Sequence, residues 1–157
     1  MPYELAGQTT ATIAVSTSAG VVEVTGVPIA PQSPAIFLLD AAGDAAALHL
    51  DGTVVSTTSP ASAGEALEIF ATGLGPVSNT PADGTAPPSG TLAVDQLITA
   101  VTIGGVNAQV LFAGLAPGFV GLYQLNVVVP SGLPAGPATI TISEGSLPGN
   151  SAVIQLH

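Results

Sequence analysis

The sequence predicts an all-β protein, an antiparallel β-sandwich preceded by an extra β-hairpin, from three observations. Short segments alternate apolar and polar residues between turn residues, as residues 66–71 do between Gly64 and Gly73. The segments are joined by turn-like stretches that suit antiparallel neighbours. No long amphipathic helix pattern interrupts them. At 157 residues, the chain can form one ordinary domain with its own core.

The N-terminal residues 1–27 are predicted to form a hairpin. Strands are expected over residues 8–15, where Thr alternates with apolar residues, and over the Val-rich residues 21–27. Residues 16–20 would form the loop between them. Residues 28–34 follow as a Pro-rich extended segment, which cannot donate a full ladder of backbone hydrogen bonds.

The middle of the chain contains short predicted strands and one long loop. Residues 35–39 and 45–50 have strand patterns, and the Asp-Gly dipeptide at 51–52 is typical of a two-residue hairpin turn. Residues 66–71 form the central predicted strand. Residues 76–90 are rich in Pro, Ser, Thr and Gly and predict an exposed loop longer than most in compact domains. We expect this loop to mediate an interaction or to cover a sheet edge.

The C-terminal half predicts a run of strands joined by short turns. These strands are expected over residues 98–103, 106–112, 122–129, 137–143 and 151–156. The Gly-Gly pair at 104–105 makes the first two the clearest hairpin in the chain. Strands connected in this way, without helices, are typical of an antiparallel sandwich.

The two ends of the chain carry the same pattern. Residues 2–7 and 11–15 match residues 130–136 and 138–142, and each match then leads into a second strand. We therefore predict a complete sandwich over residues 28–157, preceded by a hairpin that resembles the end of a preceding repeat. A hairpin without its own domain exposes unpaired edges, so it is also a candidate strand-exchange element.

The charge of the chain excludes several classes of function. There are no Lys or Arg residues and ten Asp and Glu residues, which gives a formal net charge of -10 at pH 7. Nucleic acids and anionic membrane surfaces are not expected as partners, because no basic side chain neutralises their phosphates. Membrane insertion is not expected either, since no run of about 18 apolar residues occurs. The chain has no cysteine, so its fold depends on burial rather than on disulfides.

Several motifs, spaced in order along the chain, resemble one protein family. They are Pro-Ala-Ile-Phe at 34–37, Ile-Phe-Ala-Thr-Gly-Leu-Gly-Pro at 69–76, Val-Thr-Ile-Gly-Gly at 101–105 and Ala-Pro-Gly-Phe-Val-Gly-Leu-Tyr-Gln-Leu-Asn at 116–126. This set is similar to the Solibacter-type C-terminal domain, an uncharacterised family found at the end of large secreted bacterial proteins. That family is in turn similar to immunoglobulin-like TIG/IPT modules.

The resemblance covers the predicted sandwich, residues 28–157. It implies an immunoglobulin-like antiparallel β-sandwich and an extracellular or cell-surface location. It implies no catalytic residue. The absence of Lys and Arg departs from the family and suggests an unusual setting, such as acidic or hot water or a surface hidden in an assembly.

A calcium site is the sharpest chemical hypothesis. Asp40, Asp44 and Asp51 lie within a short, turn-rich stretch, and Ca²⁺ binds six to eight oxygen ligands, including backbone carbonyls. Their spacing is not that of an EF-hand loop, and aspartates in turns often accept hydrogen bonds from their own backbone instead. An ion between copies of the chain is a further expectation. Weaker candidate ligands are Glu65, Glu68, Asp83 and Asp95.

The sequence does not favour an enzyme. It contains no Gly-x-Ser-x-Gly motif, and His49 and His157 are the only histidines available as bases. His49 alternates with Leu48 and Leu50, so we expect it to be an exposed histidine on a strand. No catalytic or cofactor-binding residue is predicted.

These observations predict an extracellular structural protein, a subunit of a fibre or repeat array that assembles with copies of itself by strand addition, with calcium as a stabilising ion. A charge-poor, apolar surface and a hairpin without a domain both favour assembly. Two alternatives remain open, a passive cell-adhesion or spacer module and a carbohydrate-binding module. The latter predicts that a glycan contacts Tyr123 or the loop 76–90.

Overall fold

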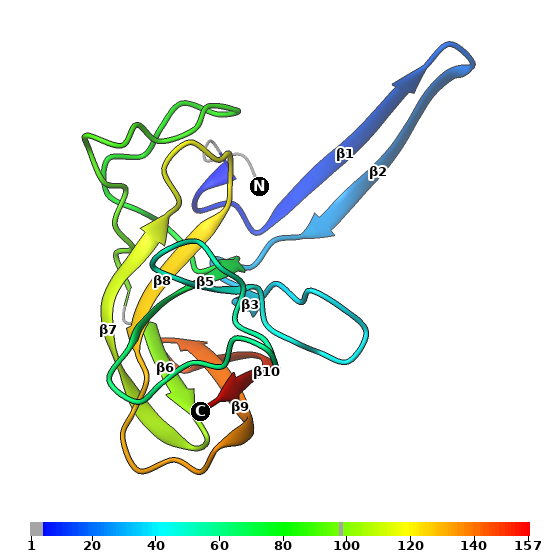
Figure 1. Ribbon diagram of the computed structural model, residues 1–157. Helices are drawn as coiled ribbons and strands as arrows, with labels where there is room; N and C mark the ends of the chain where they lie inside the picture. The colour runs from blue at the N-terminus through cyan, green and yellow to red at the C-terminus, as the bar shows by residue number, and fades with distance from the viewer. Residues whose placement is uncertain (1–4, 98) are drawn as a thin grey trace.

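The computed structural model describes residues 5–97 and 99–157, and the elements in this part of the chain are all β-strands (Figure 1). The ten strands are β1 (Thr10–Thr17), β2 (Gly20–Pro28), β3 (Ala35–Ile36), β4 (Ala47–His49), β5 (Ala66–Thr72), β6 (Thr99–Ile103), β7 (Val106–Leu115), β8 (Tyr123–Val128), β9 (Gly136–Glu144) and β10 (Leu147–Leu156). The predicted all-β class, the N-terminal hairpin and the order of the strands are confirmed. Residues 1–4 of the predicted hairpin segment 1–27 and residue 98 of the predicted strand 98–103 lie outside the described residues.

The strands after the hairpin form one barrel-like sheet. Hydrogen bonding runs in the order β10-β9-β6-β7-β8-β5-β3, β4 also pairs with β5, and every pair of named strands is antiparallel. This single path nearly closes on itself. The all-β antiparallel part of the prediction is therefore confirmed, with the strands following one curved path.

Backbone hydrogen bonds close most of the gap between the ends of this path. Along β10, Val153 donates to the Gly43 carbonyl and accepts from the Ala45 N–H, both at 2.8 Å. Farther along the same strand, Ala61 donates to the Gln155 carbonyl at 2.8 Å. These bonds satisfy groups that would otherwise form an open edge, which is a site for unwanted strand pairing.

One side chain completes the closure between β3 and β10. The Asn150 amide accepts a hydrogen bond from the Ile36 N–H at 2.6 Å and donates one to the Ile36 carbonyl at 3.0 Å. A single asparagine thus replaces both bonds that a strand neighbour would make. The two ends of the sheet are fixed to each other at this point.

The core lies inside the barrel-like sheet and follows the predicted alternation. In β5, Leu67, Ile69 and Ala71 are buried, whereas the residues between them are half-buried. The opposite wall contributes Ile140 and Ile142 of β9. Aliphatic side chains of this kind interdigitate at high density, which explains how a chain without Trp or disulfides can form a core.

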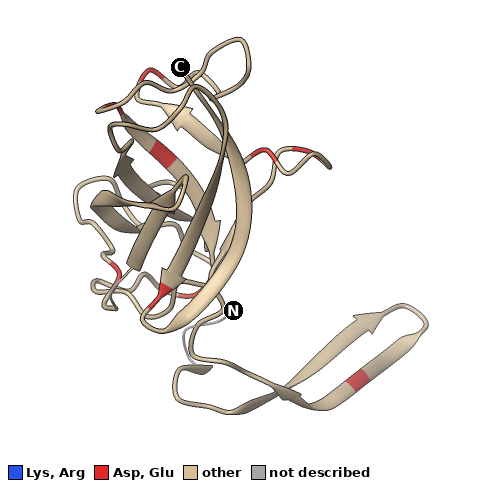
Figure 2. Ribbon diagram, turned by 90° about the horizontal axis from the view of Figure 1, so that it is seen from below, with Lys and Arg blue, Asp and Glu red and all other residues tan. Residues whose placement is uncertain are grey.

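The hairpin β1–β2 is a separate two-stranded sheet that projects from the body (Figures 1 and 2). Its strands pair from Thr17 and Gly20 at the tip to Thr10 and Pro28 at the base, with an irregularity between Ala11 and Ile13. The predicted loop 16–20 is therefore shorter, because the strands continue almost to the tip.

Local turn chemistry explains the other boundaries. Gly104 and Gly105 have φ of 57° and 79°, as a tight hairpin turn between β6 and β7 requires, and the predicted turn is confirmed. The predicted strands 35–39 and 45–50 are present but shorter, because regular pairing with β5 includes only β3 and β4. The predicted loop 76–90 contains no named strand.

Candidate functional site

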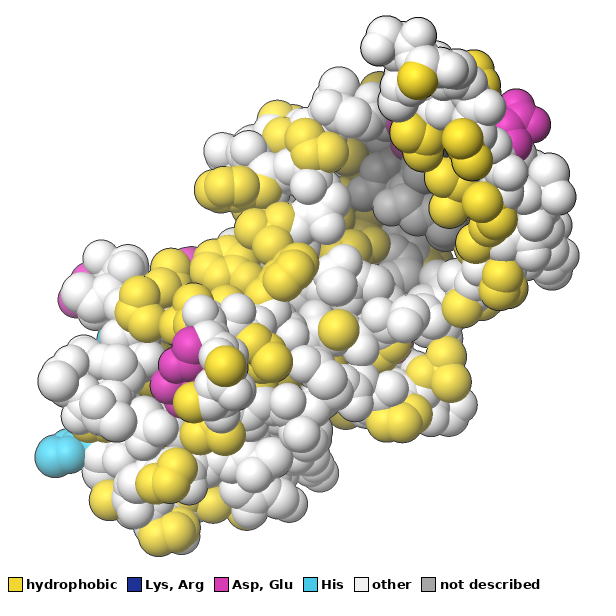
Figure 3. All heavy atoms as spheres, turned by 90° about the vertical axis from the view of Figure 1, so that its right-hand side faces the viewer, with side chains coloured by type: hydrophobic (Ala, Val, Ile, Leu, Met, Phe, Trp, Pro, Cys, Tyr) yellow, Lys and Arg dark blue, Asp and Glu magenta, His cyan; other side chains and the backbone are white. Residues whose placement is uncertain are grey.

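The hairpin β1–β2 presents an apolar face to solvent. Ile13 pairs with Val24 and Val15 pairs with Val22, and residues paired directly across an antiparallel ladder lie on the same face. These four side chains are 53% to 70% exposed. Figure 3 shows hydrophobic side chains following one another along this projecting element. The result is a continuous apolar strip without cover.

The other face of the hairpin is more polar. It carries the pair Ala14–Glu23 and the pair Ser16–Val21. Since β1 and β2 form a sheet of only two strands, their outer edges are paired with no other strand in the described part of the chain. The hairpin thus combines an amphipathic cross-section with two free edges, the two features that strand addition and sheet packing use.

The body exposes a second apolar surface beside β3. Phe37, Leu38 and Leu39 are 44% to 52% exposed and form the longest run of consecutive, exposed large apolar residues in the described part of the body. Their backbone is already paired, because Phe37 donates to the Phe70 carbonyl at 3.0 Å and Leu39 donates to the Asp44 carbonyl at 2.8 Å. This segment can therefore take a partner through its side chains.

Two of the predicted calcium ligands belong to one turn. Asp40 accepts hydrogen bonds through Oδ1 from the backbone N–H groups of Ala42, Gly43 and Asp44, at 2.9, 3.0 and 3.2 Å. The Asp40 side chain is exposed and that of Asp44 is half-buried. Asp40 therefore stabilises its own turn through one oxygen, the role that aspartates in turns often have.

The third predicted ligand, Asp51, stabilises a different turn. Its Oδ1 accepts from the Thr53 N–H at 2.9 Å and from the Thr53 hydroxyl at 2.7 Å, and these bonds lower the pKa of the Asp51 carboxyl. Across residues 5–97 and 99–157, no three His, Cys, Asp or Glu side chains are grouped so that they could hold a metal ion. Calcium binding by Asp40, Asp44 and Asp51 remains a prediction.

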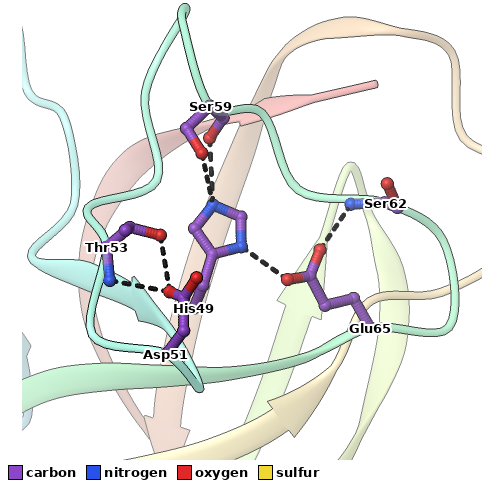
Figure 4. A network of polar contacts seen from close by, with 6 residues as sticks. All are labelled: His49, Asp51, Thr53, Ser59, Ser62 and Glu65. Carbon is purple, nitrogen blue, oxygen red and sulfur yellow. Dashed lines mark hydrogen bonds and ion pairs between the residues drawn. The ribbon is translucent and has the colours of Figure 1, made fainter.

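His49 forms a polar network at the end of β4 (Figure 4). Its Nδ1 lies 2.5 Å from Glu65 Oε1, and its Nε2 lies 3.1 Å from the Ser59 carbonyl and 3.2 Å from Ser59 Oγ. Glu65 also accepts from the Ser62 N–H at 2.8 Å. The expectation of an exposed histidine is wrong, because the ring is only 12% exposed and is held by these contacts.

The His49 network resembles a Ser-His-acid triad, but Nε2 contacts the Ser59 carbonyl as well as the Ser59 hydroxyl. The Ser59 carbonyl and the Glu65 carboxylate only accept hydrogen bonds, so an imidazole with hydrogens on both Nε2 and Nδ1 satisfies both contacts. The hydrogen bond to Glu65 accordingly raises the pKa of His49, and Glu65 has a lowered pKa despite its partial burial. Below its folded pKa, the imidazole carries both hydrogens and cannot remove the proton of Ser59, and its contact with Glu65 is then an ion pair.

The network borders a shallow depression of about 330 Å³, which includes Leu50 and Ala66 in its lining. Such a surface offers few convergent apolar contacts to a small molecule. Tyr123, a candidate for contact with a glycan, is buried, and its hydroxyl donates to the Gly75 carbonyl. Among the residues described, no helix is long and apolar enough to cross a membrane.

Sequence reasoning missed the buried acidic residue Glu144. It is fully buried at the end of β9 and contacts Thr99 of β6. A signal was present, because Ile140, Ile142 and Glu144 have the spacing of residues on one face of a strand. That spacing places Glu144 on the core side, but it does not reveal the group that it contacts.

The chain matches no protein-family model and no curated protein by sequence. Among solved structures, the crystal structure of a "putative phosphatase" from Bacteroides thetaiotaomicron matches 64% of this chain, at 20% sequence identity and a TM-score of 0.34. The match spans only 16% of that protein. At this level of similarity, it supports neither a fold assignment nor an activity.

Proposed function

We propose that this chain is a non-enzymatic, extracellular structural protein, an immunoglobulin-like module that assembles with copies of itself into a fibre or array through the hairpin β1–β2. The observation that carries the proposal is the open apolar face formed by Ile13, Val15, Val22 and Val24. The similarity of several motifs to a family of secreted proteins supports the extracellular setting.

Burial of the apolar face against a partner is energetically favourable. Burial of one Val or Ile side chain contributes roughly 1.5–3 kcal/mol, so four of them can drive an association. An isolated two-stranded hairpin is also only marginally stable in water. A partner that covers the face would therefore stabilise both the contact and the hairpin itself.

A second copy of this chain is the partner that the sequence repeat favours. Ile13 and Val15 match Ile140 and Ile142, which are fully buried against the core of the body. The hairpin therefore has the apolar pattern of the strand pair β9–β10, which is part of the barrel-like sheet. The run Phe37–Leu39 on the body of another copy offers an exposed apolar surface for it.

A contact between the hairpin of one copy and the body of the next is heterologous, because it joins two different surfaces. Contacts of this type propagate into rings or open filaments. The hairpin projects away from its own body, so each copy can present one surface of each kind (Figure 1). This geometry supports a fibre rather than a closed dimer.

The test compares threonine substitutions on the two faces of the hairpin. Val15→Thr, Val22→Thr and Val24→Thr together preserve shape and β-propensity but make the apolar face polar. We expect the unchanged chain to form filaments by electron microscopy and this triple variant to sediment as a monomer. Circular dichroism of each variant would verify that it retains its β-structure.

The matched control places threonine on the opposite face, through Ala14→Thr and Ser16→Thr. This variant should assemble like the unchanged chain. Filaments of the triple variant that are indistinguishable from those of the control would contradict the role of the apolar face. A monomeric unchanged chain at all concentrations would instead favour the spacer or adhesion module.

A further inference from the structure

Glu144 is a buried acid for which the described structure offers no basic partner. Its side chain is fully buried, and Oε1 has no hydrogen-bond partner. The chain contains no Lys or Arg. Burial of an ionised carboxylate without compensation is so costly that the group takes up a proton instead, unless a cation accompanies it. The surroundings of Glu144 distinguish between a proton and a metal ion as the source of this positive charge.

The contacts of Thr99 require a proton on one carboxyl group. Thr99 Oγ1 lies 2.7 Å from Glu144 Oε2 and 2.7 Å from Asp95 Oδ2. A threonine hydroxyl has one hydrogen, so it can donate to one of these oxygens only. Two ionised carboxylates would leave the other contact without a hydrogen. One of the two acids therefore donates to Thr99.

Glu144 is the acid that holds this proton. Asp95 is only half-buried, whereas Glu144 is completely buried. The chain of donation thus runs from the Glu144 carboxyl to Thr99 Oγ1, and from the Thr99 hydroxyl to Asp95 Oδ2. Burial, repulsion from Asp95 and the side-chain contact with Asp95 raise the pKa of Glu144 to about 7, whereas a hydrogen bond donated by Thr99 to the ionised carboxylate would lower it.

A metal ion explains the site less well than a proton does. Glu144 Oε1 is in contact with protein atoms and inaccessible to a water molecule, which leaves no room beside it for a hydrated cation. Within the described residues, Asp95 is the charged group that interacts with Glu144. The residues opposite Glu144 on the neighbouring strands are Thr99 and Leu147, which do not ionise.

The segment that contains Asp95 holds the base of the long loop 76–90. The backbone N–H of Asp95 donates to the Ala113 carbonyl of β7 at 2.9 Å, and the backbone N–H of Gln96 donates to the Pro76 carbonyl at 3.0 Å. In the same segment, the Val94 carbonyl accepts a hydrogen bond from the backbone N–H of Ser78 at 2.7 Å. Repulsion between Asp95 and Glu144 would therefore act on residues 94–96, which connect the base of the loop 76–90 to β7.

We propose that Glu144, Thr99 and Asp95 form a proton-operated latch that fastens the base of the loop 76–90 to β9. With the proton in place, the hydrogen bonds connect the loop base to the sheet. When the proton leaves, two carboxylates repel each other across one hydroxyl, and the segment around Asp95 loosens.

The first experiment measures the titration of Glu144 in the full chain. The ¹³C chemical shift of its side-chain carboxyl, followed by NMR from pH 4 to 9, should have a midpoint near 7. Asp95→Asn removes the repelling charge and should move this midpoint to lower pH. A midpoint near 4.5, the ordinary value for glutamate, would overturn the proposal.

The second experiment measures the loop base. After correction for intrinsic rates, the amide hydrogens of Asp95 and Gln96 should exchange at least tenfold faster at pH 8.5 than at pH 5.5. Glu144→Gln, which can donate to Thr99 at every pH, should abolish this difference. Glu68→Gln on β5 is the control and should retain it. The same pH-dependent exchange in Glu144→Gln as in the unchanged chain would overturn the latch. If Glu144→Gln does not fold, the midpoint of the Glu144 titration in the unchanged chain tests the proposal, with a value near 7 supporting it and a value near 4.5 contradicting it.

Discussion

At the scale of single residues, the ion pair between His49 and Glu65 links stability to pH. The raised pKa of His49 stabilises the folded state fully below the ordinary value of 6.5, and this contribution is lost as the pH rises through the folded pKa. The lowered pKa of Glu65 contributes above its ordinary value of 4.5 and is lost as the pH falls through its folded pKa. The pair is therefore most stabilising between these two ordinary values.

We predict that His49→Gln lowers the free energy of unfolding by about 1–2 kcal/mol near pH 6, because it removes a partly screened, charge-assisted hydrogen bond. At pH 9 the loss should be clearly smaller. Urea denaturation at both pH values measures this. In a double-mutant cycle with Glu65→Gln, an interaction energy that is the same at pH 6 and pH 9 would contradict the ion pair.

At the scale of elements, the end of β5 depends on a close backbone approach. Gly73 follows this strand with φ of +71°, and its carbonyl accepts from the Ser33 N–H at 2.8 Å. A Cβ atom at Gly73 would lie 2.1 Å from the Ser33 carbonyl oxygen. Glycine is thus required both for the left-handed backbone and for the space, and it lets the Pro-rich segment 28–34 lie against β5.

We predict that Gly73→Ala lowers the free energy of unfolding by about 3 kcal/mol or more, because both backbones must move. Gly64→Ala is the matched control. Gly64 has φ of +81° but nothing within 4 Å of its added Cβ, so that variant should lose only about 1 kcal/mol. Urea denaturation of the two variants separates the steric clash from the conformational cost, and equal losses would show that the clash is relieved.

At the scale of the whole molecule, charge opposes the proposed assembly. Each copy has a formal net charge of -10, and its acidic residues have no Lys or Arg to offset them (Figure 2). Copies therefore repel each other over about 10 Å at 0.1 M ionic strength and over longer distances in dilute buffer. Apolar contact through the hairpin must exceed this repulsion. Screening ions, and calcium in particular, should promote the association.

We predict that sedimentation velocity will show larger assemblies in 0.5 M NaCl than in 10 mM NaCl, because salt screens the repulsion and favours apolar contact. If Asp40, Asp44 and Asp51 bind calcium, millimolar CaCl₂ should act more strongly than NaCl of equal ionic strength, and a chelator should reverse this. The triple variant Asp40→Asn, Asp44→Asn and Asp51→Asn should respond to CaCl₂ no more strongly than to NaCl of equal ionic strength. Assemblies that dissociate as salt increases would instead indicate a contact made by charges.

The sequence by itself determined the features that depend on neighbouring residues. The alternation in β5, the glycine turn after β6, the N-terminal hairpin and the absence of Lys and Arg can all be predicted, because each rests on residues a few positions apart or on composition. The alternation of side chains between the two faces of a strand also places Glu144 on the core side of β9. The exposure of the hairpin's apolar face, however, depends on what lies next to it.

Only the tertiary structure decided the contacts between distant segments. The hydrogen bonds of Val153 with residues 43 and 45 turn a predicted series of strands into a nearly closed sheet. The approach of Glu65 to His49, and of Asp95 to Glu144 through a shared hydroxyl, follows from the register between elements far apart in the chain. Alternation assigns a face to each residue, but the partner on that face is fixed only when the sheet closes.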